Sequence, residues 1–180
     1  MIEQSETRQV ILRVAEELFM RHGYVGVSMR LLVEQIAKQR RLTKPAIYYH
    51  FSDKEALFVA VLLNVAERNG HQLRAAAAAN GSLRTRLVAL AEVLGRLDPE
   101  SLTRMRLDIA EHVGAAARAE LHQAFQRDIS GPVYAVFDLF ARAGELRPGL
   151  SAALATAAFL GLVSSLVARV GTERRVEAAG

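Results

Sequence analysis

The sequence predicts an all-α fold, and three observations support that prediction. No segment alternates apolar and polar residues as a half-buried strand does, whereas apolar residues recur along the chain with the 3.6-residue period of a helix. Helix-start and helix-stop residues separate these periodic segments. The chain has 180 residues, 51% of them apolar and none of them cysteine, so it can bury a core without disulfides. We expect a three-helix N-terminal unit, a long connecting helix and a C-terminal helical bundle.

The first two helices are defined by their caps and apolar faces. The first is expected from about residue 5 to residue 22, with Gly23 as its C-terminal stop. The second begins after Ser28, a typical N-cap residue. The buried face of the first is expected to hold Val10, Ile11, Val14, Ala15, Leu18 and Phe19, and that of the second Leu31, Leu32, Ile36 and Ala37.

The third predicted helix is short. Thr43 is its expected N-cap, Pro45 lies in the first turn, where a missing N–H costs nothing, and the helix ends near Phe51. Ile47 and Phe51 are four residues apart and are expected to face inward together. Adjacent tyrosines, Tyr48 and Tyr49, cannot share one helix face, so at least one of them should be exposed.

The rest of the chain is expected to be helical as well. Ser52-Asp53-Lys54-Glu55 matches a capping box, which predicts a long fourth helix from there to about residue 79. Proline and glycine divide the chain after residue 80, although 115–144 also fits one helix kinked at Pro132. The later helices are predicted at 83–97, 99–113, 115–129, 132–144 and 151–169.

The net charge of +4 is confined to one segment. Residues 28–54 carry six basic and two acidic side chains, so the remaining residues sum to zero. A basic, aromatic helix that follows a turn within a three-helix unit is typical of the helix-turn-helix, whose second helix enters the DNA major groove. Such a helix offers small and polar groups to bases, and cations and hydroxyls to phosphates. We expect the third helix, from Thr43 to His50, to serve this purpose.

In its N-terminal part the chain resembles the TetR (tetracycline-repressor-like) family of bacterial transcription regulators. The resemblance rests on four segments of this sequence: Ala15-Glu16-Glu17-Leu18-Phe19, His22-Gly23-Tyr24, Leu42-Thr43-Lys44-Pro45-Ala46-Ile47-Tyr48-Tyr49-His50-Phe51 and Asp53-Lys54-Glu55-Ala56-Leu57. It implies a homodimer with a helix-turn-helix DNA-binding domain at 1–52 and a helical ligand-binding and dimerisation domain at 53–180. It also implies release from a palindromic operator when an unidentified small-molecule effector binds, in the bacterial cytoplasm and at the nucleoid.

The resemblance also suggests roles for individual residues. Base-facing positions fall on Lys44, Pro45, Ala46 and Tyr49, and phosphate contacts on Tyr48, His50 and Lys54. Compared with the family, the segment from Ser28 to Ile36 is about four residues longer, and two arginines occupy the turn. The expected DNA-binding set is therefore Ser28, Arg30, Arg40, Arg41, Thr43, Lys44, Pro45, Ala46, Tyr48, Tyr49, His50 and Lys54.

Two further sets are expected in the C-terminal part. An apolar or amphipathic effector would lie among the central helices, although each candidate also suits an ordinary core. A stripe of small residues at three- or four-residue spacing lets two helix backbones approach, which predicts a dimer interface. The effector candidates are Met105, Arg106, Ile109, Phe125, Tyr134, Phe137 and Phe140, and the interface candidates are Phe137, Ala157, Gly161, Ser164 and Ala168.

The sequence contains few motifs that would indicate another class of function. There is no HExxH, GxSxG or Walker-type phosphate loop, so we expect no enzyme, no cofactor and no metal site. Asp108 and His112 are interpreted as a surface pair on a helix. The charged and apolar residues at the N-terminus alternate, so we expect no secretion signal there. Residues 148–168 are uncharged and long enough to span a bilayer. The alternative hypothesis is therefore a helical small-molecule sensor that is attached to a membrane through this segment. The small and polar residues of the segment argue against membrane insertion, so we expect no membrane attachment.

Overall fold

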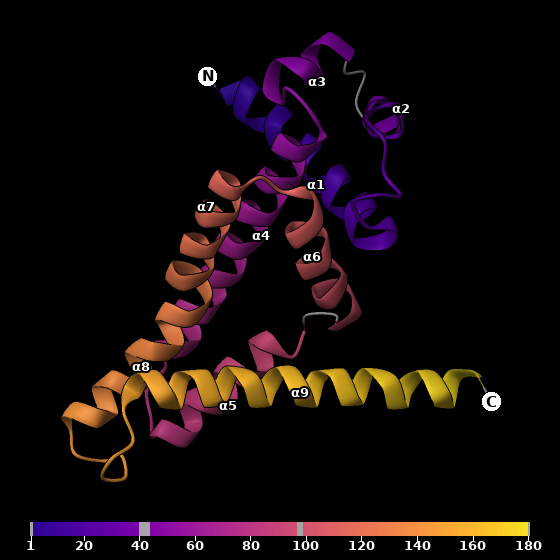
Figure 1. Cartoon of the computed structure of the whole chain (residues 1–180). Helices are drawn as coiled ribbons and strands as arrows, with labels where there is room; N and C mark the ends of the chain where they lie inside the picture. Colours follow the sequence, from indigo (N-terminus) through magenta and orange to yellow (C-terminus); the bar gives the residue numbers. More distant parts are fainter. Residues whose placement is uncertain (1, 40–43, 97–98, 180) are drawn as a thin grey trace. The chain divides into compact units, whose positions relative to one another are not determined.

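The computed structural model describes residues 2–39, 44–96 and 99–179, and within those ranges every regular element is a helix (Figure 1). The all-α prediction is therefore confirmed. In chain order the elements are α1 (Ile2–His22), α2 (Met29–Gln39), α3 (Lys44–His50), α4 (Lys54–Ala77), α5 (Leu83–Leu94), α6 (Pro99–His112), α7 (Ala115–Phe125), the π-helical segment η1 (Gln126–Ser130), α8 (Gly131–Arg142) and α9 (Ala152–Ala179).

The helices pack as two compact units. The first unit is Met1–Val65 with Thr103–Leu121, and the second is Ala66–Leu102 with His122–Gly180. The 24-residue α4 contributes its first half to one unit and its second half to the other, as expected for the long connecting helix. By packing, most of α6 therefore belongs with the N-terminal helices. The boundary predicted after residue 52 is of another kind, because it divides a DNA-binding domain from a ligand-binding domain. It stays a prediction.

The caps of α1 and α2 are those predicted from the sequence. Gly23 has a φ of 70°, which glycine adopts without strain, and its N–H donates to the carbonyl of Phe19 at 2.9 Å. Ser28 Oγ accepts the N–H of Leu31 at 3.1 Å. These two ends fix where α1 stops and where α2 begins.

The predicted capping box at the start of α4 is wrong. Asp53 is the cap, because its Oδ1 accepts the N–H of Ala56 at 2.8 Å, and Ser52 Oγ only supports it by donating to Asp53 Oδ2 at 2.9 Å. These bonds favour the carboxylate and hold the pKa of Asp53 below its ordinary value. Glu55 accepts instead the backbone N–H of Gly114 at 2.8 Å, a residue from the turn after α6.

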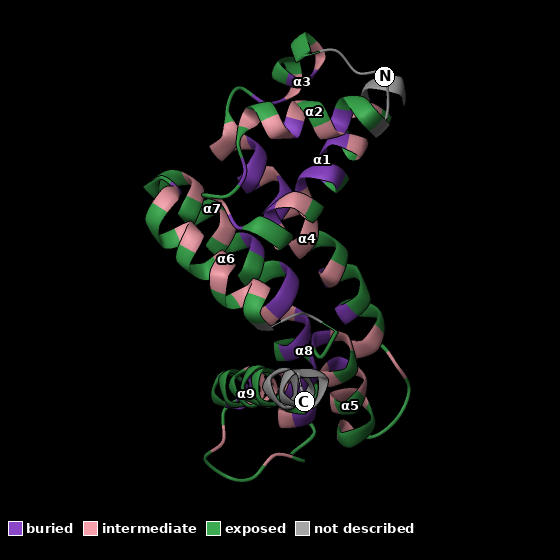
Figure 2. Ribbon diagram, turned by 90° about the vertical axis from the view of Figure 1, so that its right-hand side faces the viewer, coloured by how far each residue is buried: buried purple, intermediate pink, exposed green. Residues whose placement is uncertain are grey.

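The core of the first unit lies between α1, α2, α3 and the N-terminal half of α4, where Figure 2 shows buried residues in purple. It includes most of the predicted α1 face, and also Leu12, which the pattern did not place there. Ala37 is exposed rather than buried, whereas Val33 is partly buried against the core. The buried members are Ile11, Leu12, Val14, Ala15, Phe19, Val27, Leu32, Ile36, Ile47, Phe51, Leu57, Phe58, Val59, Val61, Leu62 and Val113.

The second unit has its own core, built from the C-terminal half of α4 with α5, η1, α8 and the start of α9. From Ala115 to Arg142 the chain is helical throughout, so the predicted break at 131 is absent and the one-helix alternative is nearer to the structure. At the end of η1 the N–H of Gly131 donates to the carbonyl of Gln126, five residues back. A wider turn suits this site because Pro132 has no N–H for the carbonyl four residues before it.

α9 continues to Ala179, ten residues beyond its predicted end. One face packs on α8 and α5 through Ala152, Ala155 and the partly buried Phe159. Its segment Ala152–Arg169 is long and apolar enough to cross a membrane by length and composition, a property that core helices of other proteins share.

Candidate nucleic-acid interface

α3 presents a polar and aromatic surface and is anchored by two apolar residues. Ile47 is fully buried and Phe51 is 5% exposed, as their spacing predicts. Tyr49 is 75% exposed and Tyr48 40%, so both tyrosines reach solvent. The sequence folds in this way because its inward positions are apolar, and because Pro45 costs the first turn no hydrogen bond.

One cation and several rings lie along this surface. Lys44, at the start of α3, is exposed, and its Nζ lies 5.9 Å from the centre of the Tyr48 ring. At the other end, the rings of Tyr49 and His50 are 5.4 Å apart, and those of His50 and Phe51 are 6.4 Å apart. Pro45 is exposed and Ala46 partly exposed. The structure therefore brings the described α3 candidates onto one short helix, and their individual roles toward DNA stay predictions.

The other predicted contacts lie before α3. Ser28 uses its Oγ as a cap acceptor, which leaves its O–H able to donate. Arg30 pairs with Glu34 through Nε and Oε1 at 3.1 Å, but both are exposed, and such pairs are weak and readily exchanged for a phosphate. Arg40, Arg41 and Thr43 lie outside the described residues.

Lys54 has a role within the fold that the sequence did not suggest. Its Nζ donates to the carbonyls of Tyr24 and Val27, both at 3.1 Å, and lies 3.9 Å from the centre of the Tyr24 ring. Its ammonium therefore closes the end of the α1–α2 connection with two of its three N–H groups. The predicted phosphate contact stays a prediction and would have to use the third.

Tyr24 is also held from α6. Its backbone N–H donates to Asp108 Oδ2 at 2.9 Å, and its ring stacks on His112 with centres 4.9 Å apart and planes inclined by 18°. Burial, and then the charges of Glu55 and Asp53, raise the pKa of the Tyr24 hydroxyl. The interpretation of Asp108 and His112 as a surface pair is wrong, because both contact Tyr24. Only their spacing on one helix face hinted at a shared target.

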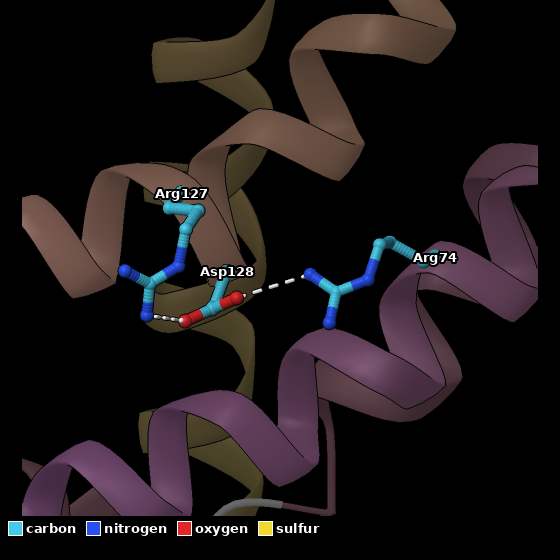
Figure 3. Close-up of polar contacts among 3 residues, drawn as sticks. All are labelled: Arg74, Arg127 and Asp128. Atoms are coloured by element: carbon cyan, nitrogen blue, oxygen red, sulfur yellow. Dashed lines mark hydrogen bonds and ion pairs between the residues drawn. The ribbon is translucent and has the colours of Figure 1, made fainter.

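A second charged cluster lies in the second unit (Figure 3). The carboxylate of Asp128, on η1, accepts from Arg74 Nη1 at 3.0 Å and from Arg127 Nη2 at 2.6 Å. Burial acts to raise the pKa of Asp128, but the two arginines outweigh it and the pKa lies below its ordinary value. A Cβ on Gly70 of α4 would lie 2.7 Å from Asp128 Cβ, so this close approach of η1 to α4 requires glycine.

The predicted effector residues are divided between the two units. Met105 and Ile109 pack partly buried against the core of the first unit. Phe137 and Phe140 are buried in the core of the second, whereas Phe125 and Tyr134 are almost half exposed. The remaining candidate, Arg106, is exposed on α6. An effector-lining role for any of them stays a prediction.

The predicted dimer stripe lies on the exposed side of α9. All four small residues, Ala157, Gly161, Ser164 and Ala168, are exposed within the chain, and a Cβ on Gly161 would meet no atom within 4 Å. Phe137, the fifth candidate, is buried against Phe159 with ring centres 6.1 Å apart. Across the described residues, no three His, Asp or Glu side chains are grouped so that they could hold a metal ion.

Comparison with known proteins matches the N-terminal segment to a family. The profile of bacterial regulatory proteins of the tetR family matches residues 11–61, from α1 into α4. The HTH-type transcriptional repressor AcnR of Corynebacterium diphtheriae is 46% identical over 66 residues, which are 37% of this chain and 33% of AcnR. The chain spans about a third of the length of the curated relatives it matches.

Solved structures share the fold over most of the chain. The transcriptional regulator FadR from Bacillus subtilis, in complex with stearoyl-CoA, has a TM-score of 0.74 at 15% identity, over 93% of this chain and 88% of FadR. AibR, in complex with isovaleryl coenzyme A and operator DNA, has a TM-score of 0.65 at 21% identity, over 89% of this chain and 85% of AibR. The segment 11–61 is thus similar in sequence to the tetR family of bacterial regulatory proteins, and the helices of most of the chain are arranged as in these solved structures.

Proposed function

We propose that this protein is a ligand-responsive transcription regulator, most simply a repressor, that binds a palindromic operator as a homodimer and is released by a small-molecule effector. The observation that carries the proposal is α3, whose exposed tyrosines and Lys44 form a cationic and aromatic surface on a helix fixed by Ile47. The repressor AcnR, 46% identical over the N-terminal segment, supports repression.

In this mechanism, each protomer of the dimer places one α3 in the major groove. The two helices must then lie about one DNA turn apart, roughly 34 to 36 Å, to read a near-palindrome. An effector that binds more tightly to a conformation with a different spacing shifts the population away from DNA. The exposed small-residue face of α9 supports the dimer.

The effector is proposed to be apolar or amphipathic. FadR and AibR, which share the fold, are bound to acyl-coenzyme A thioesters, so such thioesters are the first compounds to test. The proposal includes no enzymatic activity, because the sequence lacks a catalytic constellation. It also includes no membrane attachment, because AcnR and FadR are transcription regulators. The protein would act in the bacterial cytoplasm, where its DNA is.

A gel-shift titration tests the proposal. Purified full-length protein is titrated against the intergenic DNA upstream of its own gene and against random duplex of the same length, at physiological salt. We expect a palindromic fragment to bind at least about a thousandfold more tightly than random duplex. Equal binding of all duplexes would refute sequence-specific regulation, and acyl-coenzyme A thioesters are then added to the specific complex to look for release.

A further inference from the structure

One arginine outside the helix-turn-helix touches the end of α3. Arg8, on α1, is exposed, and its guanidinium carbon lies 5.5 Å from the centre of the Phe51 ring. Among the described residues, no carboxylate forms an ion pair with Arg8. Within the described residues, its charge is therefore placed against an aromatic ring and is not neutralised.

Contact with the ring leaves the hydrogen-bonding groups of the guanidinium available. A guanidinium that stacks on a ring interacts through its face, while its N–H donors point outward in the plane of the group, in the fork that matches two phosphate oxygens. Phe51 is itself rigidly held, since its side chain is 5% exposed and its N–H donates to the carbonyl of Ile47 at 3.0 Å. Arg8 is thus oriented in advance, which lowers the entropy cost of a contact.

The position of Arg8 complements that of Lys44. Lys44 is the first residue of α3, whereas Phe51 directly follows the last, so cations lie at both ends of this seven-residue helix. His50 and Tyr49 connect the Phe51 ring to the exposed face through successive ring contacts. Phosphates border the major groove on both sides, so a helix lying in it can have both ends near backbone.

We propose that Arg8 is a phosphate contact supplied by α1, which clamps the backbone next to the C-terminal end of the recognition helix. This inference rests on the proposed DNA-binding function. Because the contact is to phosphate, it contributes to affinity and register and carries no base preference.

The test compares Arg8→Ala with Arg8→Lys and with the control Arg84→Ala, which removes an exposed arginine from α5 in the second unit. Affinities for the operator and for random duplex are measured over a series of salt concentrations. We expect Arg8→Ala to weaken both by a similar factor, about tenfold. Because each of the two protomers loses one phosphate contact, the steepness of log K against log salt should fall by about two. Arg8→Lys should keep the slope but recover only part of the affinity, because lysine cannot form the fork.

A merely structural role for the Arg8–Phe51 contact makes a different prediction. It would lower the melting temperature of Arg8→Ala but leave the salt slope of the folded protein unchanged, which would overturn the inference. Phe51→Leu supplies a second check. If the ring orients Arg8, the affinity losses of Phe51→Leu and Arg8→Ala are less than additive in the double variant, and full additivity would count against this role of the ring.

The outcome also separates the two proposals. If Lys44→Ala lost DNA binding and Arg8→Ala kept the wild-type affinity and salt slope, only the role of Arg8 would be refuted. If wild-type protein bound no duplex in a salt-dependent way, the DNA-binding proposal would fail, and the role of Arg8 with it.

Discussion

Replacing Asp128 by asparagine tests how the second unit is held together. The side chain is 3% exposed, and it is the shared acceptor for Arg74 and Arg127, which are 44% and 66% exposed. Stranding a fully buried charge costs about 3 to 5 kcal/mol. Here the arginines can return to water, so the expected loss is smaller.

The magnitude follows from the hydrogen bonds. Each charge-assisted bond is worth about 1.5 to 3 kcal/mol. The Oδ1 of an asparagine can still accept from one arginine, but its NH₂ group can only donate and so cannot bond to the other. We therefore expect Asp128→Asn to lower the free energy of unfolding by about 2 to 3 kcal/mol. For a chain of this length, this corresponds to a fall of about 5 to 10 °C in Tm.

Thermal denaturation followed by circular dichroism measures this effect, with Asp138→Asn as the matched control. Asp138 pairs with Arg142 at 2.8 Å on the same helix, but Arg142 is 79% exposed. Such i,i+4 surface pairs contribute about 0.3 to 0.5 kcal/mol, so the control should melt within about 2 °C of wild type. Equal melting of the two variants would refute the role assigned to Asp128.

The contribution of Asp128 to stability has a defined pH dependence. Because the pKa of Asp128 is lower in the folded protein than in the unfolded chain, its contribution is fully present above the unfolded value of about 3.9. It is lost as the pH falls from there through the lower folded value. The difference in stability between wild type and Asp128→Asn should therefore be constant near neutral pH and narrow below about pH 4.

Four other substitutions have clear expectations. Gly70→Ala should destabilise the protein despite the higher helix propensity of alanine, because its Cβ would lie 2.7 Å from Asp128 Cβ; a raised melting temperature would contradict this contact. Lys54→Met should lower the free energy of unfolding by about 2 kcal/mol, because two hydrogen bonds are lost. Lys44→Met should leave Tm unchanged and weaken operator binding. Equal melting temperatures of the two variants would refute the structural role of Lys54. Gly161→Leu should reduce the dimer fraction in light scattering, and an unchanged mass would exclude that stripe from the interface.

The local features of the N-terminal unit could be predicted from the sequence because they depend on neighbours. The inward pair Ile47 and Phe51 follows from helical periodicity, and the caps at Gly23 and Ser28 from residue type and position. Where two adjacent residues both suit a cap, as at Ser52 and Asp53, sequence position does not decide between them. In the structure Asp53 is the cap, and Glu55 accepts instead from Gly114, which is far away in sequence.

The features that could not be predicted join residues far apart in sequence. Lys54 bonds to carbonyls 27 and 30 residues earlier, and Asp108 accepts an N–H from 84 residues earlier. Periodicity contains no information on such contacts, because it describes one helix face and not what that face meets. The same limit hid Arg8, which α1 places against a ring at the end of α3.

The contacts of Tyr24 have a consequence for protein engineering. A fragment ending at residue 52, the boundary at which a DNA-binding module would be cut for transfer to another sensor, lacks the ammonium of Lys54, the carboxylate of Asp108 and the ring of His112. Such a fragment would keep all three helices of the motif and lose every one of these supports for the α1–α2 connection. A transferable module from this protein would have to include the start of α4 and a substitute for α6.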